Sequence, residues 1–200
     1  RNSEKRFAKK FFPQPYGDSM NKGKIEVICG PMFSGKSEEL LRRLKRASIA
    51  KRPFQLFKPA TDTRYSENEV VSHSGQKLEC TPTSNPYDIL QSIKNSTTIV
   101  AIDEAQFFDE SIVTVALQLT ELGIRVITAG LDMDSRGTPF GSMPQLLAIA
   151  EDVTKLTAVC EACGEAATHS FRRESCNTSQ VLLGEKDIYE ARCREHWSPA

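Results

Sequence analysis

An eight-residue stretch contains the residue types that bind the phosphates of a nucleotide. Residues 30–37 read Gly-Pro-Met-Phe-Ser-Gly-Lys-Ser and fit the pattern G-x-x-x-x-G-K-[ST]. Gly30 and Gly35 allow the backbone to turn, so that successive N–H groups face an anion at a helix N-terminus. Lys36 supplies a positive charge for the β- and γ-phosphates, and Ser37 supplies a hydroxyl for Mg²⁺. The stretch predicts a phosphate loop that binds ATP; a tight strand-to-helix turn without a ligand is the alternative.

Two adjacent carboxylates, Asp103 and Glu104, stand at the end of the most apolar segment of the chain. Ligands of parallel sheets bind at the carboxyl ends of strands, so we expect this pair to face the phosphate loop. Asp103 suits the metal side of a phosphoryl transfer, through water, and Glu104 suits the base that deprotonates the acceptor hydroxyl. A hydrolase could use Glu104 to orient water instead, and an acid pair favoured by a helix dipole needs no ligand at all. The predicted ATP contacts are Gly30, Pro31, Met32, Phe33, Ser34, Gly35, Lys36, Ser37, Asp103, Glu104, Ala105 and Gln106.

Three cysteines and a histidine near the C-terminus have the spacing of a metal site. Cys160 and Cys163 form one x₂ pair, and Cys193 and His196 form a second pair after 29 intervening residues. Four soft ligands suit a tetrahedral, structural Zn²⁺, with unpaired thiols or a disulfide as the alternatives. The remaining residues of these types are expected to be ordinary thiols and surface or structural histidines: Cys29, Cys80, Cys176, His73 and His169.

The elements around these residues alternate between strands and helices. This alternation predicts an α/β fold, namely a P-loop (RecA-like) domain with a mostly parallel sheet flanked by helices. The expected strands are 24–29, 54–58, 97–103 and 124–129, the expected helices are 36–51, 112–122 and 143–150, and 70–81 is a possible hairpin. From about residue 157 paired cysteines and turn residues replace this pattern, which predicts a small zinc domain.

Three regions follow from this reading. Residues 1–20 are expected to be a flexible extension or a cloning remnant, with an arm that packs on a partner subunit as the alternative. They carry +3, and the rest of the chain carries −3. Residues 21–156 form the P-loop domain and residues 157–200 the zinc-binding domain.

Composition excludes several classes of protein. The chain has 26 basic and 26 acidic residues, so it lacks the positive surplus that would bind nucleic acid by bulk charge. It has no apolar run of membrane-spanning length, so we expect no membrane partner. Paired cysteines without a secretory signal indicate a reducing, cytoplasmic location.

Taken together, these motifs resemble one family, the type II or cytosolic-type thymidine kinases. The resemblance runs from Ile25 to about Trp197. It rests on the order and spacing of six blocks: 30–37, 62–66 (Asp-Thr-Arg-Tyr-Ser), 103–108 (Asp-Glu-Ala-Gln-Phe-Phe), 130–141 (Gly-Leu-Asp-Met-Asp-Ser-Arg-Gly-Thr-Pro-Phe-Gly), 155–160 and 189–196.

The resemblance implies that ATP, with Mg²⁺, phosphorylates the 5′-hydroxyl of thymidine to give dTMP and ADP. It implies that Glu104 is the catalytic base, that Asp62 and Arg64 lie near the metal and phosphates, and that residues 131–141 form a lid-like loop. It also implies a homotetramer and feedback inhibition by dTTP. The implied thymidine contacts are Phe107, Leu131, Phe140, Gln180, Val181, Leu182, Leu183, Gly184 and Tyr189.

Two positions depart from the family pattern, and two other functions compete with a kinase. Ser135 stands where the family often has an aromatic residue, and Glu185 stands where a second glycine is usual. Both changes bear on nucleoside selectivity. The alternatives are a P-loop motor that remodels nucleic acid through its zinc element, and a regulatory protein that binds nucleotide without turnover. The neutral charge disfavours the first, and the presence of Lys36, Ser37 and Glu104 disfavours the second.

Overall fold

The computed structural model describes residues 22–61, 69–71, 77–173 and 188–199. Its centre is a sheet of six strands in the order β5-β2-β6-β7-β1-β8, and every neighbouring pair in it is parallel. The strands are β1 (Ile25–Cys29), β2 (Phe54–Pro59), β5 (Thr81–Thr83), β6 (Ile99–Ile102), β7 (Arg125–Gly130) and β8 (Asp152–Lys155). Because all six run the same way, their carboxyl ends meet at one edge of the sheet.

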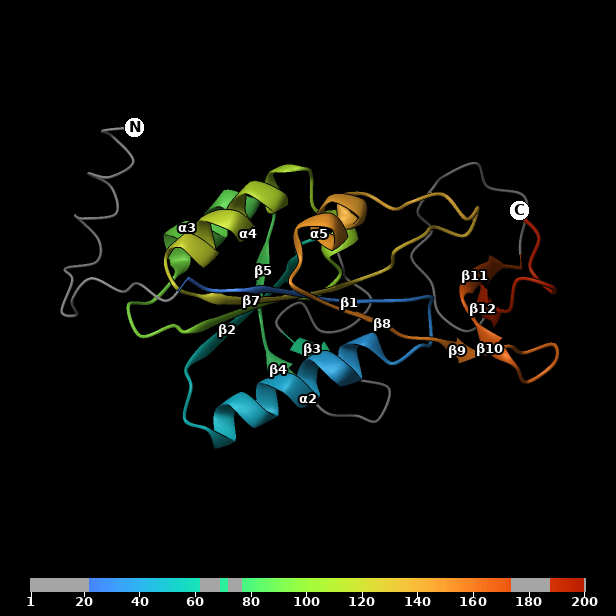
Figure 1. Cartoon of the computed structure of the whole chain (residues 1–200), viewed down its shortest axis with the longest axis horizontal. Coiled ribbons are helices and arrows are strands. Elements are labelled where there is room, and N and C mark those ends of the chain that lie inside the picture. Colours follow the sequence, from blue (N-terminus) through green and yellow to red (C-terminus); the bar gives the residue numbers. More distant parts are fainter. Residues whose placement is uncertain (1–21, 62–68, 72–76, 174–187, 200) are drawn as a thin grey trace.

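Helices cover both faces of this sheet (Figure 1). One face packs against α3 (Pro86–Ser92), α4 (Ser111–Glu121) and α5 (Met143–Ile149), and the other packs against α2 (Lys36–Ile49). The central strands between these layers are mostly apolar and are buried along nearly their whole length, as expected for a sheet covered on both faces. The result is a three-layer α/β fold with a core on each face of the sheet.

The sequence of α2 explains its place in the fold. Leu40, Leu41, Leu44 and Ala47 recur at helical spacing and are all buried against the sheet. The helix ends at Ile49, two residues before the predicted end, because the backbone turns left-handed shortly afterwards, with φ 54° at position 51. The N–H of Arg52 then bonds the Ala47 carbonyl at 2.9 Å and closes the helix end.

The predicted α/β alternation is confirmed, but the sequence analysis did not predict α3, β5 or β8. Helix α3 is only seven residues long and carries a weak apolar pattern, although Asn85 caps it by accepting a 3.0 Å hydrogen bond from the Tyr87 N–H. Strand β8 is mostly exposed at the edge of the sheet, so its residues lack the continuous apolar signal of the central strands. The predicted hairpin corresponds to the antiparallel strands β3 (Glu69–Val71) and β4 (Lys77–Glu79).

Small two-stranded sheets follow the last strand of the main sheet. Antiparallel pairs form between β9 (Ala158–Val159) and β10 (Ala166–Ala167), and between β11 (His169–Arg172) and β12 (Tyr189–Arg192). A compact cluster of Ala158, Cys160, Ala167 and Ala191 forms their core. These strands lie together at one end of the molecule (Figure 1).

Within the described residues, no helix has both the length and the apolar character needed to cross a membrane.

Candidate active site

The predicted phosphate loop lies between β1 and α2. The loop leaves the sheet after Cys29, and α2 begins at Lys36. Gly30 and Gly35 both adopt positive φ angles, 144° and 81°, which glycine tolerates best. A Cβ atom on Gly30 would also lie 2.5 Å from the Leu156 carbonyl oxygen, so only glycine fits there. Phe33 has a φ of 64°, an uncommon conformation for a residue with a side chain.

Within the loop, one backbone carbonyl group accepts hydrogen bonds from two side chains. The Lys36 Nζ donates to the Pro31 carbonyl at 2.7 Å, and the Ser34 hydroxyl donates to the same oxygen at 2.8 Å. The N–H groups of the first turn of a helix point out of its N-terminus, so the start of α2 has the orientation that favours an anion. The loop therefore combines a fixed ammonium group with a helix N-terminus.

The acidic pair meets this loop at the carboxyl edge of the sheet. Strand β6 ends at Ile102, and the Ser37 hydroxyl donates to the Asp103 Oδ2 at 3.2 Å. This contact joins residues 66 positions apart and brings the loop after β1 beside the loop after β6. The hydroxyl and the carboxylate are oxygen ligands of the kind that Mg²⁺ prefers, so the pair fits a magnesium ion bound with nucleotide.

Asp103 has unusual electrostatics. Burial raises the pKa of its carboxyl group, and the neighbouring charge of Glu104 raises it further. Hydrogen bonds from the Glu104 N–H and the Ser37 hydroxyl lower the pKa, as does the charge of Lys36, but these effects are smaller. The resulting pKa is about 7. A cation at this point would remove the penalty for burying the negative charge.

Glu104 is held in a strained conformation beside it. Its φ is 50°, in the left-handed region, and its backbone N–H donates to Asp103 Oδ1 at 3.0 Å. The Gln106 side-chain amide donates to the Glu104 carboxylate, and the Gln106 Oε1 accepts from the Leu131 N–H at 3.0 Å. Gln106 is buried, and it lies in the 3₁₀ turn η1 (Ala105–Phe107). The glutamate is thus aimed by a second side chain that is itself fixed to the end of β7.

The predicted lid begins where β7 ends. Met133 and Pro139 form an antiparallel bridge, and the Asp134 carboxylate accepts from the N–H groups of Arg136 and Thr138 at 2.9 Å each. Residues 133–139 are therefore a small hairpin closed by an internal carboxylate.

The predicted nucleoside-binding aromatics fall into two groups. Phe107 and Phe140 contact each other edge to face, with ring centroids 5.6 Å apart, and Leu131 is buried at the start of the lid. Tyr189 lies in the C-terminal strands, buried opposite Arg172 in the β11–β12 pair. Asp62, Arg64 and residues 180–184 lie outside the described residues.

The predicted metal ligands come together at the C-terminal end. The ligand atoms of Cys160, Cys163, Cys193 and His196 all lie within 4.8 Å of one another. The Sγ atoms of Cys163 and Cys193 are 3.8 Å apart, close to the edge of a tetrahedron built on Zn–S bonds of about 2.3 Å. Burial raises the pKa of the Cys160 thiol, but backbone N–H donors including those of Cys163 and Cys193 outweigh it and lower the pKa to about 6. The cluster is compatible with zinc.

Two buried charges at the same edge escaped the sequence analysis. Lys58, the fifth residue of β2, is buried, as is Asp132, two residues beyond β7. The Asp132 Oδ2 pairs with the Lys155 ammonium at 2.7 Å, and its Oδ1 finds no hydrogen-bond partner within the described part of the chain. Burial, and then the charge of Asp132, raise the pKa of the Cys29 thiol to about 11. Both charges sit at strand ends, so the rule that singled out Asp103 could have found them.

Comparison with known proteins agrees with this geometry. The profile of the family described as "Thymidine kinase" matches residues 23–197. A thymidine kinase from Porphyromonas gingivalis W83 is 54% identical over 179 residues, which cover 90% of this chain and 87% of that protein. Thymidine kinases from Bacteroides thetaiotaomicron and Bacteroides fragilis YCH46 are 53% and 51% identical, covering 89% and 92% of this chain and 88% and 91% of theirs.

Proposed function

The chain belongs to the thymidine kinase family and is an ATP-dependent thymidine kinase, and from this premise we propose how its residues carry out the transfer. One observation carries the proposal: the 3.2 Å contact between Ser37 and Asp103, which puts the phosphate loop and the acidic pair at one edge of the sheet. An ATP molecule in the loop would present its γ-phosphate beside Glu104. The acceptor alcohol would approach from the side of the lid.

The phosphate loop holds and neutralises the triphosphate. Backbone N–H groups at residues 33–37 and the helix N-terminus bind phosphate oxygens. The Lys36 ammonium has three N–H donors, so it binds the β- and γ-phosphates while one N–H still donates to the Pro31 carbonyl. Mg²⁺, held by Ser37 and by Asp103 through water, would supply a positive charge that neutralises the phosphate oxygens. Asp62 and Arg64 are proposed to add to this charge, as the family resemblance implies.

Glu104 is the proposed general base. The 5′-oxygen of thymidine forms a bond to the γ-phosphorus, and the bond from that phosphorus to the β,γ-bridging oxygen breaks. The hydroxyl proton moves to the Glu104 carboxylate, and ADP leaves with the electron pair of the broken bond. Gln106 keeps this carboxylate aimed, because its amide contacts it on one side and the backbone of Leu131 fixes it on the other.

The thymine ring is proposed to bind between apolar walls. Leu131, Phe107, Phe140 and Tyr189 would bury its faces and its methyl group, which is worth about 0.8 kcal/mol per CH₂-sized group. Backbone groups of residues 180–184 are proposed to read its polar edge. Ser135 and Glu185 are the positions where selectivity among nucleosides is expected to differ from that of other family members.

The remaining proposals concern the metal, regulation and assembly. The Cys₃His cluster is proposed to hold a structural Zn²⁺ that stabilises the small C-terminal core. None of the described cysteines forms a disulfide, which suits the cytoplasmic location that we propose. Inhibition by dTTP and a homotetramer are proposed from the family resemblance; inhibition kinetics and light scattering test them.

A nucleoside panel with ATP and Mg²⁺ tests the function, with monophosphate and ADP as the readout. We expect thymidine to give dTMP and ADP in equal amounts. ATP hydrolysis that requires added DNA would favour the motor, and nucleotide binding without any product would favour the regulatory protein. Either result would contradict the proposed transfer.

A further inference from the structure

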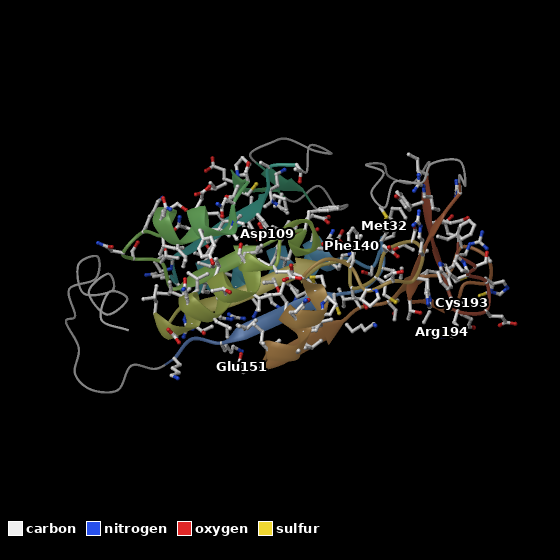
Figure 2. All side chains as sticks on the ribbon, turned by 90° about the horizontal axis from the view of Figure 1, so that it is seen from above. Met32, Asp109, Phe140, Glu151, Cys193 and Arg194 are labelled. Atoms are coloured by element: carbon white, nitrogen blue, oxygen red, sulfur yellow. The ribbon has the colours of Figure 1, made fainter. Side chains whose placement is uncertain are left out.

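A serine of the C-terminal strands bonds the phosphate loop. Ser170, in β11, is buried, and its hydroxyl accepts a hydrogen bond of 3.0 Å from the Met32 backbone N–H. The two residues are 138 positions apart. Met32 lies toward the end of the molecule that carries Cys193 and Arg194 (Figure 2). The loop proposed to bind ATP is therefore attached to a part of the chain outside the main sheet.

The next residue of the loop makes a second attachment. Phe33 packs against the small C-terminal core, which includes Cys160 and Ala191. Its left-handed φ of 64° is a conformation that costs about 1–2 kcal/mol for a residue with a Cβ atom, so surrounding contacts have to hold it. Packing against the C-terminal core supplies such contacts.

The hydrogen bond of Ser170 fixes one peptide unit. The N–H and C=O of a trans peptide point in opposite directions, so an N–H bound to Ser170 directs the Pro31 carbonyl into the loop. That carbonyl is the group that accepts from Lys36 at 2.7 Å and from Ser34 at 2.8 Å. Rotation of this peptide would remove the anchor of the ammonium that neutralises the phosphates.

The same bond keeps one N–H group of the loop from binding phosphate. Proline at 31 has no N–H, and the N–H of Met32 is committed to Ser170. In the proposed complex, backbone N–H groups from Phe33 to Ser37 bind the phosphates. A loop whose peptides are already oriented loses less conformational entropy on binding, and so binds more tightly.

From these contacts we propose that Ser170 is a positioning residue for ATP: it orients the Pro31–Met32 peptide, and through it Lys36, before the nucleotide binds. This inference rests on the proposed function, because it assumes that the loop binds the ATP phosphates. It assigns to the C-terminal strands a role in nucleotide affinity.

Ser170→Ala, Ser170→Thr and a control, Thr97→Val, test the proposal. Thr97 is also buried and donates its hydroxyl to the Gln55 side chain at 2.6 Å, but it precedes β6 at the opposite edge of the sheet. The measurements are calorimetric Kd values for the Mg²⁺ complex of the β,γ-imido analogue of ATP and for thymidine, with zinc content and Tm for each variant.

We expect Ser170→Ala to weaken the ATP analogue about 2- to 10-fold, the usual range for one hydrogen bond, and to leave thymidine affinity and zinc content unchanged. Ser170→Thr keeps the hydroxyl and should restore most of the affinity. Thr97→Val should lower Tm without changing either Kd.

Three outcomes would overturn the proposal. Unchanged analogue affinity in Ser170→Ala would show that the bond only stabilises the fold, and equal weakening of both ligands would show a general disturbance. Tighter binding would show that Ser170 competes with phosphate for the Met32 N–H. Failure of the wild-type protein to bind the analogue would instead count against the proposed function.

Discussion

At the scale of single residues, the most informative feature is the strain at Glu104. A non-glycine residue at φ 50° costs free energy, and such residues persist where several contacts determine them together. Here Asp103 accepts from the backbone of Glu104, and Gln106 holds its carboxylate. The strained conformation therefore fixes the direction of the Glu104 carboxylate, and a base needs a fixed direction when it removes a proton from a bound alcohol.

Replacing this carboxylate by its amide tests that role. In Glu104→Gln we expect turnover to fall roughly 10²- to 10⁴-fold, the usual worth of a general base, while ATP binding is retained. Steady-state kinetics and calorimetry measure the two quantities. Glu110→Gln, at an exposed acid shortly after the site, is the control and should keep normal turnover. Near-normal turnover in Glu104→Gln would exclude the assignment.

At the scale of elements, the lid and the turn that carries Gln106 are packed backbone to backbone. Gly141 ends the lid with φ 51°, and a Cβ atom there would lie 2.2 Å from the Gln106 carbonyl oxygen. This separation is too short for any side chain. The close approach therefore ties the position of the lid to the turn that follows Glu104.

Gly141→Ala should push these elements apart. We expect the free energy of unfolding to fall by about 2–5 kcal/mol, from the left-handed φ and the overpacking together, and kcat to fall as well. Gly164→Ala is the matched control, because Gly164 also has a positive φ, 79°, but has open space where a Cβ atom would lie. This variant should lose only about 1–2 kcal/mol of unfolding free energy and keep its kcat. Equal losses of stability in the two variants would contradict the packing argument. Urea denaturation and steady-state kinetics make the comparison.

The zinc-binding element has a prediction of its own. Cys163→Ser removes one of four clustered ligands, so zinc content and Tm should both decrease. Metal analysis and thermal denaturation measure these effects. Glu165→Gln, at an exposed residue of the same turn, should change neither. A Cys163→Ser protein with stoichiometric zinc would refute the ligand assignment.

At the scale of the whole molecule, a buried glutamate joins the sheet to α2 away from the catalytic edge. Glu26, in β1, is 1% exposed and pairs with Arg43 of α2 and Arg125 of β7 at 2.7 Å each. Arg43 also donates to Thr154 in β8 at 2.7 Å. Burial alone would raise the pKa of Glu26, but hydrogen bonds and charges from Arg125 and Lys24 outweigh it and lower the pKa to about 2.

This shift predicts a pH dependence of stability. A folded-state pKa below the ordinary value of 4.5 means that the stabilisation is fully present above about pH 4.5 and is lost as the pH falls toward 2. Hydrogen bonds from Arg42 lower the pKa of Glu39 to about 2, so Glu39 titrates over the same pH range. The contribution of Glu26 is therefore measured as the difference in unfolding free energy between the wild-type protein and Glu26→Gln. At pH 7 we expect the unfolding free energy of Glu26→Gln to be lower than that of the wild-type protein, on the order of 2 kcal/mol. Below about pH 4.5 this difference in unfolding free energy should decrease. A gap independent of pH, in denaturation curves from pH 7 to 3, would contradict the assignment.

The sequence alone determined the features that depend on neighbours along the chain. The phosphate loop, its flanking strand and helix, the apolar strand that ends in Asp103-Glu104 and the paired x₂ ligands are all local patterns, because backbone turns, helix faces and chelating pairs are set by spacing. The α/β class followed from their alternation. Elements with short or exposed patterns, such as α3, β5 and β8, were missed for the same reason.

Only the tertiary structure decided which of these patterns meet. The strand order places β7 between β1 and β6, and the loop–carboxylate contact follows from that order, which no local pattern encodes. The Gln106 contact with Leu131 and the Ser170 contact with Met32 join residues 25 and 138 positions apart. Hydrogen bonds between distant residues depend on how packed layers align, and a single sequence carries no periodic signal for that alignment.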